Sequence, residues 1–166
     1  EARDDAVVLK TSFALGVRRA TENVTVSHCH LVTRHNGLKL GTESTGDFRR
    51  IVMRDCTIVG QRYPVKGELS CGIALQAVDG GALERVVVSS IRMMDVRAPI
   101  FVRLARRGRA QAVRTAGVLR DVSISNVVAT GASGTSSITG IPGHPVERIS
   151  LQNVGETAAG GGKADL

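Results

Sequence analysis

The chain has 166 residues, of which 42% are hydrophobic and 2% are aromatic, and its formal net charge is +7 at pH 7. This length fits one domain, and no apolar run is long enough to cross a bilayer, so the sequence indicates a soluble globular chain with no membrane partner. The excess of Lys and Arg permits an anionic partner, but the basic cluster from Arg103 to Arg114 lacks interleaved aromatic residues, so nucleic acid is not expected.

The chain begins Glu1-Ala-Arg-Asp-Asp, without Met or a signal peptide, and we expect it to be a piece of a longer protein. Two kinds of apolar-alternating segment then interleave along it. The short kind covers residues 6–10, 37–41, 72–76, 99–103 and 137–141. The long kind begins at Asn23 and recurs from Arg50, Arg85, Asp121 and Arg148, at spacings of 27, 35, 36 and 27 residues. Alternation of apolar and polar residues predicts strands in both kinds.

Each long segment carries apolar residues at its second, fourth and seventh positions. The change of phase between the fourth and seventh positions requires a bend, and a polar or turn-forming residue lies there in every copy: His28, Asp55, Ser90, Asn126 and Asn153. Asn and Asp tolerate left-handed backbone angles, so these residues predict one corner repeated along the stack. Cys29 and Cys56 occupy the seventh position of successive copies, which favours small buried side chains over a disulfide.

The repeats predict an all-β fold, a parallel β-helix or solenoid of about five coils, each containing one segment of each kind. A propeller blade or a leucine-rich repeat would need a different spacing. We expect the β-helix domain to cover residues 1–156, incomplete at its N-terminus, and a flexible Gly-rich tail to cover residues 157–166. Loops are expected at residues 61–69 and 106–115.

The short segments place chemically useful side chains on one outer face. One buried file is predicted to consist of Val7, Leu38, Ile73, Ile100 and Ile138. Two outward columns follow: Val8, Lys39, Ala74, Phe101 and Thr139, then Lys10, Gly41, Gln76, Arg103 and Ile141. Asp4, Asp5, Arg34 and His35 directly precede the first two of these strands.

One acid beside one base is what hydrolysis of a glycosidic bond requires, and Asp4, Asp5 and His35 could supply them. The alternative is that both acids are solvated turn residues and His35 is a loop donor. His144, between Gly143 and Pro145, is expected to be a turn residue.

Two motifs resemble glycoside hydrolase family 28, the polygalacturonases. Asp4-Asp-Ala-Val-Val-Leu-Lys10 resembles the D-D-x-(I/V)-x-(I/L)-K strand of that family, and residues 35–46 (HNGLKLGTESTG) are similar to its G-H-G-G-L-x-I-G-S-E-x-S-G segment. The resemblance covers most of the chain. It implies an extracellular or periplasmic right-handed β-helix that hydrolyses pectin-like polysaccharide with inversion.

The resemblance also implies roles for individual residues. Asp4 would be the acid, Asp5 would position or activate water, and His35 would support the site. Lys39, Gln76 and Arg103 would contact substrate. The family's N-x-D strand would lie before Glu1, its R-I-K motif falls on Ala74-Leu75-Gln76, and an alignment shifted by one residue puts Asn36 at the His position.

The leading hypothesis is therefore a monomeric polygalacturonase-type glycosidase whose partner is a pectin-like polysaccharide. No cofactor is expected, and no metal, because the three Cys and four His residues show no ligand spacing. The second hypothesis is a noncatalytic carbohydrate-binding or structural β-helix fragment, favoured by the lack of the family's N-x-D aspartate in this chain and by the Ala74 and Gln76 replacements.

Overall fold

A computed structural model describes residues 1–61 and 71–158. Within these ranges the regular elements are all β-strands, and they form two sheets. The short-strand sheet contains, in spatial order, β1 (Val7–Thr11), β4 (Leu38–Ser44), β6 (Cys71–Ala77), β8 (Ala98–Leu104) and β10 (Ser137–Thr139). The long-strand sheet contains β2 (Thr21–Ser27), β5 (Phe48–Gly60), β7 (Ala82–Met94), β9 (Val118–Ala132) and β11 (Glu147–Ala158), and β3 (His30–Thr33) also pairs with β5.

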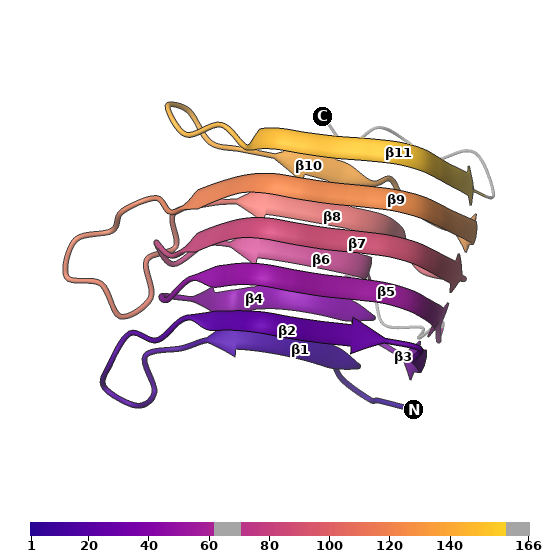
Figure 1. Cartoon of the computed structure of the whole chain (residues 1–166), viewed down its shortest axis with the longest axis horizontal. Helices are drawn as coiled ribbons and strands as arrows, with labels where there is room; N and C mark the ends of the chain where they lie inside the picture. Colours follow the sequence, from indigo (N-terminus) through magenta and orange to yellow (C-terminus); the bar gives the residue numbers. More distant parts are fainter. Residues whose placement is uncertain (62–70, 159–166) are drawn as a thin grey trace.

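The chain passes from one sheet to the other and back, so that each new strand lies beside the previous strand of its own sheet. All of these pairings are parallel. Figure 1 shows the long strands in front of the short ones, with the arrows of the two sheets pointing in opposite directions. The prediction of an all-β fold with parallel strands is confirmed, and the strand order is compatible with a β-solenoid.

The hydrophobic core lies between the two sheets. Leu38 and Leu40 of β4 are fully buried in the same cluster as Ile51 and Met53 of β5. The expected columns of the long segments are in register: Val24, Ile51, Val86, Val122 and Ile149 are successive partners along the sheet. Because side chains of a strand alternate between its faces, Lys39 projects from the outer face, as predicted.

The predicted buried file is wrong at Ile138, and its first member, Val7, is only partly buried. Val7, Leu38, Ile73 and Ile100 are successive partners, but Ile138 pairs with Val102 and is 37% exposed on the last short strand. The Ser136 hydroxyl accepts a hydrogen bond from the Ile100 backbone N–H at 3.0 Å, and pairing begins with Ser137 opposite Phe101, so the register differs from the predicted one by two residues.

The shift changes the fifth member of both outward columns. Ser137 replaces Thr139 in the first column, and Thr139 replaces Ile141 in the second. Ile141 instead forms a bridge with His144, closed by two backbone hydrogen bonds of 3.1 and 2.8 Å, with Gly143 at a positive φ of 76°. His144 therefore lies in a turn, as predicted.

The predicted corner is present in every long segment. Its five residues all have left-handed backbone angles, with φ between 52° and 56°: His28, Asp55, Ser90, Asn126 and Asn153. A second, unpredicted corner lies five residues earlier at φ between 51° and 58°: Asn23, Arg50, Arg85, Asp121 and Arg148. Asn23 and Asp121 tolerate this conformation, but Arg has no preference for it, so the three copies with Arg carried no signal for the second corner.

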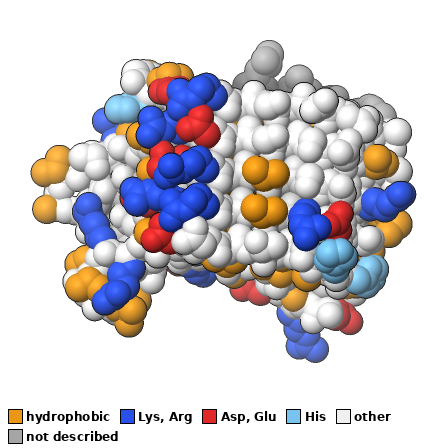
Figure 2. Space-filling model, in the orientation of Figure 1, with side chains coloured by type: hydrophobic (Ala, Val, Ile, Leu, Met, Phe, Trp, Pro, Cys, Tyr) orange, Lys and Arg blue, Asp and Glu red, His pale blue; other side chains and the backbone are white. Residues whose placement is uncertain are grey.

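A ladder of alternating charge runs across the starts of the long strands. Its members are successive partners in the sheet: Glu22, Arg49, Glu84, Arg120 and Glu147. Glu84 lies 3.3 Å from Arg49 and 2.9 Å from Arg120. Figure 2 shows charged side chains of both signs gathered along this side of the long-strand face. We name this column the charge ladder.

The remaining expectations concern the loops, the tail and the cysteines. Residues 106–115 lie between β8 and β9, as predicted, whereas the other expected loop is outside the described residues except for Gln61. Strand β11 continues through Ala158, so Thr157 belongs to the sheet and not to the expected tail, and residues 159–166 lie outside the described ranges. Cys29, Cys56 and Cys71 are free thiols. Within the described residues, no helix has the length and apolar character to span a membrane.

Candidate functional site

The Asp5 carboxylate is held by Lys39 of β4 and by Asn36, which directly precedes that strand. Its Oδ2 lies 2.7 Å from Lys39 Nζ, and its Oδ1 accepts hydrogen bonds from Asn36 Nδ2 at 2.5 Å and from the Asn36 backbone N–H at 3.3 Å. The side chains of Asp5 and Lys39 are 9% and 15% exposed. Parallel pairing of β1 with β4 brings these residues together, although 34 positions separate them in the chain.

These contacts fix the protonation state of Asp5. Burial by itself raises the pKa of the Asp5 carboxyl, but the hydrogen bonds from Lys39 and Asn36 and the positive charge of Lys39 outweigh it, and the pKa is lowered from its ordinary value of 3.8. Asp5 is therefore an anion at neutral pH.

Asp4 is exposed and is tied to the rest of the site through its backbone. Its carbonyl oxygen accepts a hydrogen bond from Thr33 Oγ1 at 2.7 Å, and Thr33 Oγ1 also accepts one from the His35 backbone N–H at 3.1 Å. Its side-chain Oδ1 accepts a hydrogen bond from the Asp5 backbone N–H at 2.7 Å. The Thr33 hydroxyl thus joins the segment of the acids to the segment of His35, whose side chain is partly buried.

Asn36 is the central residue of this corner. It is 7% exposed, its amide nitrogen donates to Asp5, and its amide oxygen accepts a hydrogen bond from the Cys71 backbone N–H at 3.2 Å. Three successive short strands are therefore connected through one side chain. In the sequence, Asn36 stood out only as the alternative match to the His of the polygalacturonase motif. Its role as a hydrogen-bonding link was not predicted, because its partners lie 31 and 35 positions away.

Lys39 lies on the same outer face as the other two predicted substrate contacts. Gln76 of β6 pairs in register with Arg103 of β8, and both line a pocket at the C-terminal ends of the short strands. Asp5 lies at the level of Asn36, about five residues nearer the strand starts, which at the rise of a β-strand is roughly 16 Å along the sheet. The predicted face is thus present, but it contains two separate groups.

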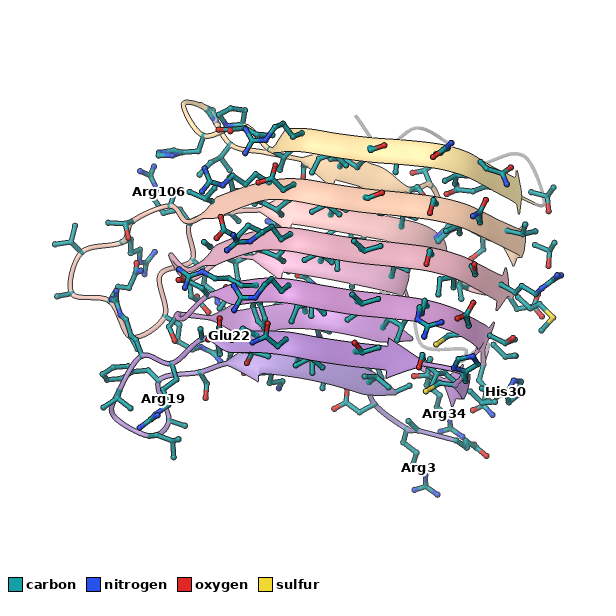
Figure 3. The ribbon with its side chains drawn as sticks, in the orientation of Figure 1. Arg3, Arg19, Glu22, His30, Arg34 and Arg106 are labelled. Atoms are coloured by element: carbon teal, nitrogen blue, oxygen red, sulfur yellow. The ribbon has the colours of Figure 1, made fainter. Side chains whose placement is uncertain are left out.

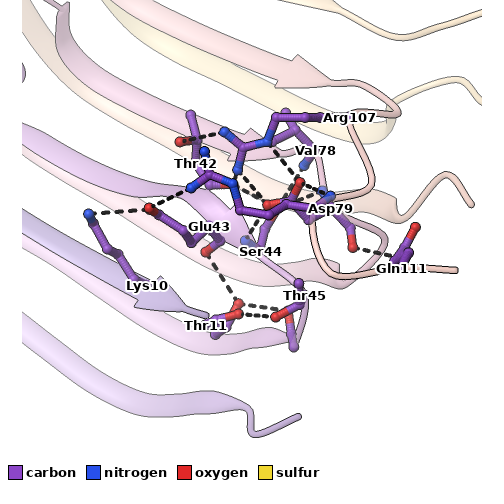
Figure 4. Close-up of polar contacts among 12 residues, drawn as sticks. Lys10, Thr11, Thr42, Glu43, Ser44, Thr45, Val78, Asp79, Arg107 and Gln111 are labelled. Atoms are coloured by element: carbon purple, nitrogen blue, oxygen red, sulfur yellow. Dashed lines mark hydrogen bonds and ion pairs between the residues drawn. The ribbon is translucent and has the colours of Figure 1, made fainter. Parts of the chain in front are cut away.

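A buried polar cluster at the C-terminal end was not predicted. The Asp79 side chain is fully buried, and its carboxylate accepts hydrogen bonds from Arg107 Nε at 2.8 Å and Nη2 at 2.5 Å and from the Arg109 backbone N–H at 2.9 Å. Arg107 Nη2 also donates to the Thr42 carbonyl oxygen at 3.0 Å (Figure 4). Arg107 therefore fastens the loop after β8 to strand β4 and to the turn after β6.

The charges of this cluster are compensated within it. Burial raises the pKa of the Asp79 carboxyl, but the hydrogen bonds from Arg107 and from the backbone N–H groups of Arg109 and Ser44 outweigh it and lower the pKa below 3.8. Glu43 is likewise placed between Lys10 and Arg109, each at 3.2 Å. The only sequence signal for this cluster was that Asp79 precedes two glycines just after a buried strand. Its partner Arg107 lies 28 residues later, so the sequence alone did not pair them.

The arrangement offers one ionised and one exposed carboxyl group at the strand starts, and arginine side chains at the strand ends. In the part of the chain that the structure describes, no group of three or more His, Cys, Asp or Glu side chains could hold a metal ion. Comparison with protein-family models, with curated proteins and with solved structures finds no match to the chain.

Proposed function

We propose that this chain forms five coils of a right-handed parallel β-helix and hydrolyses glycosidic bonds in pectin-like polysaccharide. Each coil would contain one short and one long strand, and the strand order of both sheets supports this reading. The support for the activity is the resemblance of residues 4–10 and 35–46 to the polygalacturonase motifs, together with the contacts of Asp5.

The observation that carries the proposal is the chemical difference between two adjacent carboxyl groups. Asp5 is an anion held by Lys39 and Asn36, whereas Asp4 is exposed to solvent. Inverting hydrolysis needs one carboxylic acid that protonates the leaving oxygen and one carboxylate that activates water. Asp4 would be the acid, Asp5 would help to position or activate the water, and His35 would support the site.

The test uses the full-length protein and its Asp4→Asn variant. Reducing-sugar release is measured on polygalacturonate and on rhamnogalacturonan. Because loss of a general acid removes a factor of about 10² to 10⁴, release by Asp4→Asn should fall at least about a hundredfold. Asp55→Asn is the matched control, since Asp55 lies in a corner of the long-strand sheet, and it should release sugar at the parental rate. Equal rates for the parent and Asp4→Asn would remove the catalytic role.

A noncatalytic carbohydrate-binding module is the second candidate. It is favoured by the occupation of both Asp5 oxygens by Lys39 and Asn36, which is also what a structural carboxylate requires. The presence of Ala74 and Gln76, where the family has cations, favours it too. Binding of either polysaccharide without sugar release by the parent would support this second function.

A further inference from the structure

We infer that two loops at one end of the sheets dock this protein on the surface of an anionic lipid bilayer. The first loop, residues 12–20, joins β1 to β2, and the second, residues 105–117, joins β8 to β9. Figure 1 shows both loops projecting from the same end of the molecule. The inference goes beyond the proposed function and does not depend on it.

The two loops adjoin each other, although strands β2 to β8 separate them in the chain. Phe13 and Ala14 of the first loop and Arg109 and Ala110 of the second line a common hollow of about 370 Å³. Both loops can therefore contact one surface at the same time.

The first observation is a group of exposed apolar side chains. Leu15 and Val17 of the first loop are 79% and 47% exposed, and Val113 of the second loop is 76% exposed. Single exposed apolar residues are ordinary on protein surfaces, but these are gathered on two adjacent projecting loops, which is typical of an interaction site.

Local hydrogen bonds hold these side chains away from the core. The Gly16 backbone N–H donates to the Phe13 carbonyl oxygen at 2.9 Å and Gly16 has a φ of 72°, so a tight turn places Leu15 at its tip. In the second loop, the Gln111 amide donates to the Asp79 carbonyl oxygen at 2.8 Å and accepts from the Thr115 backbone N–H at 2.9 Å. These contacts fix the loop on both sides of Val113. The apolar side chains are thus displayed in advance, and little ordering is required when they bind.

The second observation is uncompensated positive charge. The first loop contains two arginines and the second contains four, and neither contains an acidic residue. Arg107 and Arg109 are paired with Asp79 and Glu43. In the described part of the chain, the side chains of the other four form no hydrogen bond or ion pair, and all are exposed: Arg18, Arg19, Arg106 and Arg114. Figure 3 shows Arg19 and Arg106 at this end of the molecule.

The combination of apolar tips and arginines selects among anionic partners. An acidic polysaccharide would pair with the arginines but offers little apolar surface to Leu15 and Val113. A protein partner would bury about 800 Å² on each side, with aromatic side chains enriched, whereas these tips are aliphatic and stand on two separate loops.

A bilayer surface satisfies both features. Aliphatic side chains enter the boundary between headgroups and acyl chains, while the flanking arginines remain beside the anionic headgroups. The sequence-based expectation of no membrane partner rested on the lack of a segment that could cross a bilayer, and docking on the surface does not need one.

Co-sedimentation of the full-length protein with vesicles tests the inference. The vesicles contain either phosphatidylcholine alone or phosphatidylcholine with about one third phosphatidylglycerol. The protein should bind the anionic vesicles at least about tenfold more tightly than the neutral ones, and added salt should weaken this binding, since several arginines face the headgroups.

Substitutions in the loops separate the apolar contribution from net charge. Leu15→Ser and Val113→Ser should each weaken binding to the anionic vesicles by about tenfold, because each removes one inserted aliphatic side chain. The control is Val128→Ser, at a valine that is 51% exposed on β9 in the long-strand sheet, and it should bind like the parent. Thermal unfolding of each variant verifies that the fold is retained.

A second pair of variants tests the position of the charge. Arg18→Ala should weaken binding by about fivefold, whereas Arg92→Ala, which removes the same charge from β7, should not. Four results would each overturn the inference: no sedimentation with the anionic vesicles, equal affinity for both kinds of vesicle, equal affinities of Leu15→Ser and Val128→Ser, or equal affinities of Arg18→Ala and Arg92→Ala.

Discussion

Lys39 Nζ lies 2.7 Å from Asp5 Oδ2 on the outer face of the short-strand sheet, where both side chains are largely buried. The pair joins β1 to β4 and keeps Asp5 ionised beside the exposed Asp4. The positive charge of Lys39 is therefore compensated by Asp5 and is not a free cation for binding substrate.

This ion pair predicts a pH dependence of stability. The pKa of Asp5 in the folded protein is lower than its ordinary value of 3.8, so the folded protein binds the proton less readily than the unfolded chain. The stabilisation is fully present well above pH 3.8, falls as the pH drops through this value, and is lost below the folded pKa. The free energy of unfolding in urea, measured from pH 7 to pH 2.5, should decrease less steeply for Asp5→Asn than for the parent. Parallel curves for the two proteins would contradict this assignment.

Arg107 should be essential for stability, because it neutralises a fully buried carboxylate. Arg107→Met leaves Asp79 unpaired and should lower the free energy of unfolding by about 3 to 5 kcal/mol. The adjacent Arg106→Met is the control and should change it by less than about 0.5 kcal/mol, since Arg106 has no polar partner among the described residues. Urea unfolding at pH 7 measures both, and similar losses for the two variants would show that the Asp79 contact is not what matters.

Glycine is expected to stabilise the protein when it replaces a residue of the repeated corner, where φ is positive. Ser90 has a φ of 55°, which disfavours residues with a Cβ, so Ser90→Gly should raise the free energy of unfolding by about 1 kcal/mol. Ser89→Gly, at the preceding position of β7 and without a positive φ, should lower it by about 0.5 to 1 kcal/mol. The comparison is made by thermal and urea unfolding, and a loss of stability in Ser90→Gly would refute the explanation.

The charge ladder predicts a difference between its centre and its edge. Glu84 lies between Arg49 and Arg120 and is 9% exposed, so Glu84→Gln removes the carboxylate that these two arginines share and leaves them only Asp47 and Asp121 as charged partners. It should lower the free energy of unfolding by about 2 kcal/mol, and added salt should recover part of the loss. Glu22→Gln, at the exposed end of the ladder, should change it by less than about 1 kcal/mol. Equal effects in urea unfolding would show that the ladder does not act as a unit.

The sequence by itself determined the repeating strands, the apolar columns of the long segments and one of the two corners. These features depend on local alternation and on the turn preferences of residues such as Asn126 and Asp55, which every copy of the repeat displays. Ile138 shows where that reasoning ends: it pairs with Val102 and not with Ile100, whose backbone N–H donates to the Ser136 hydroxyl, and no local pattern marked this register.

Only the tertiary structure decided which polar residues meet. Asn36 and Lys39 reach Asp5, and Arg107 reaches Asp79, across 28 to 34 chain positions. The sequence correctly predicted that Lys39, Gln76 and Arg103 lie on one face. It did not predict that Lys39 contacts Asp5 near the starts of the short strands while Gln76 and Arg103 lie near their ends. The physical reason is that parallel pairing places residues of neighbouring strands about 4.8 Å apart, so contacts depend on loop lengths and on register, which composition and periodicity do not fix.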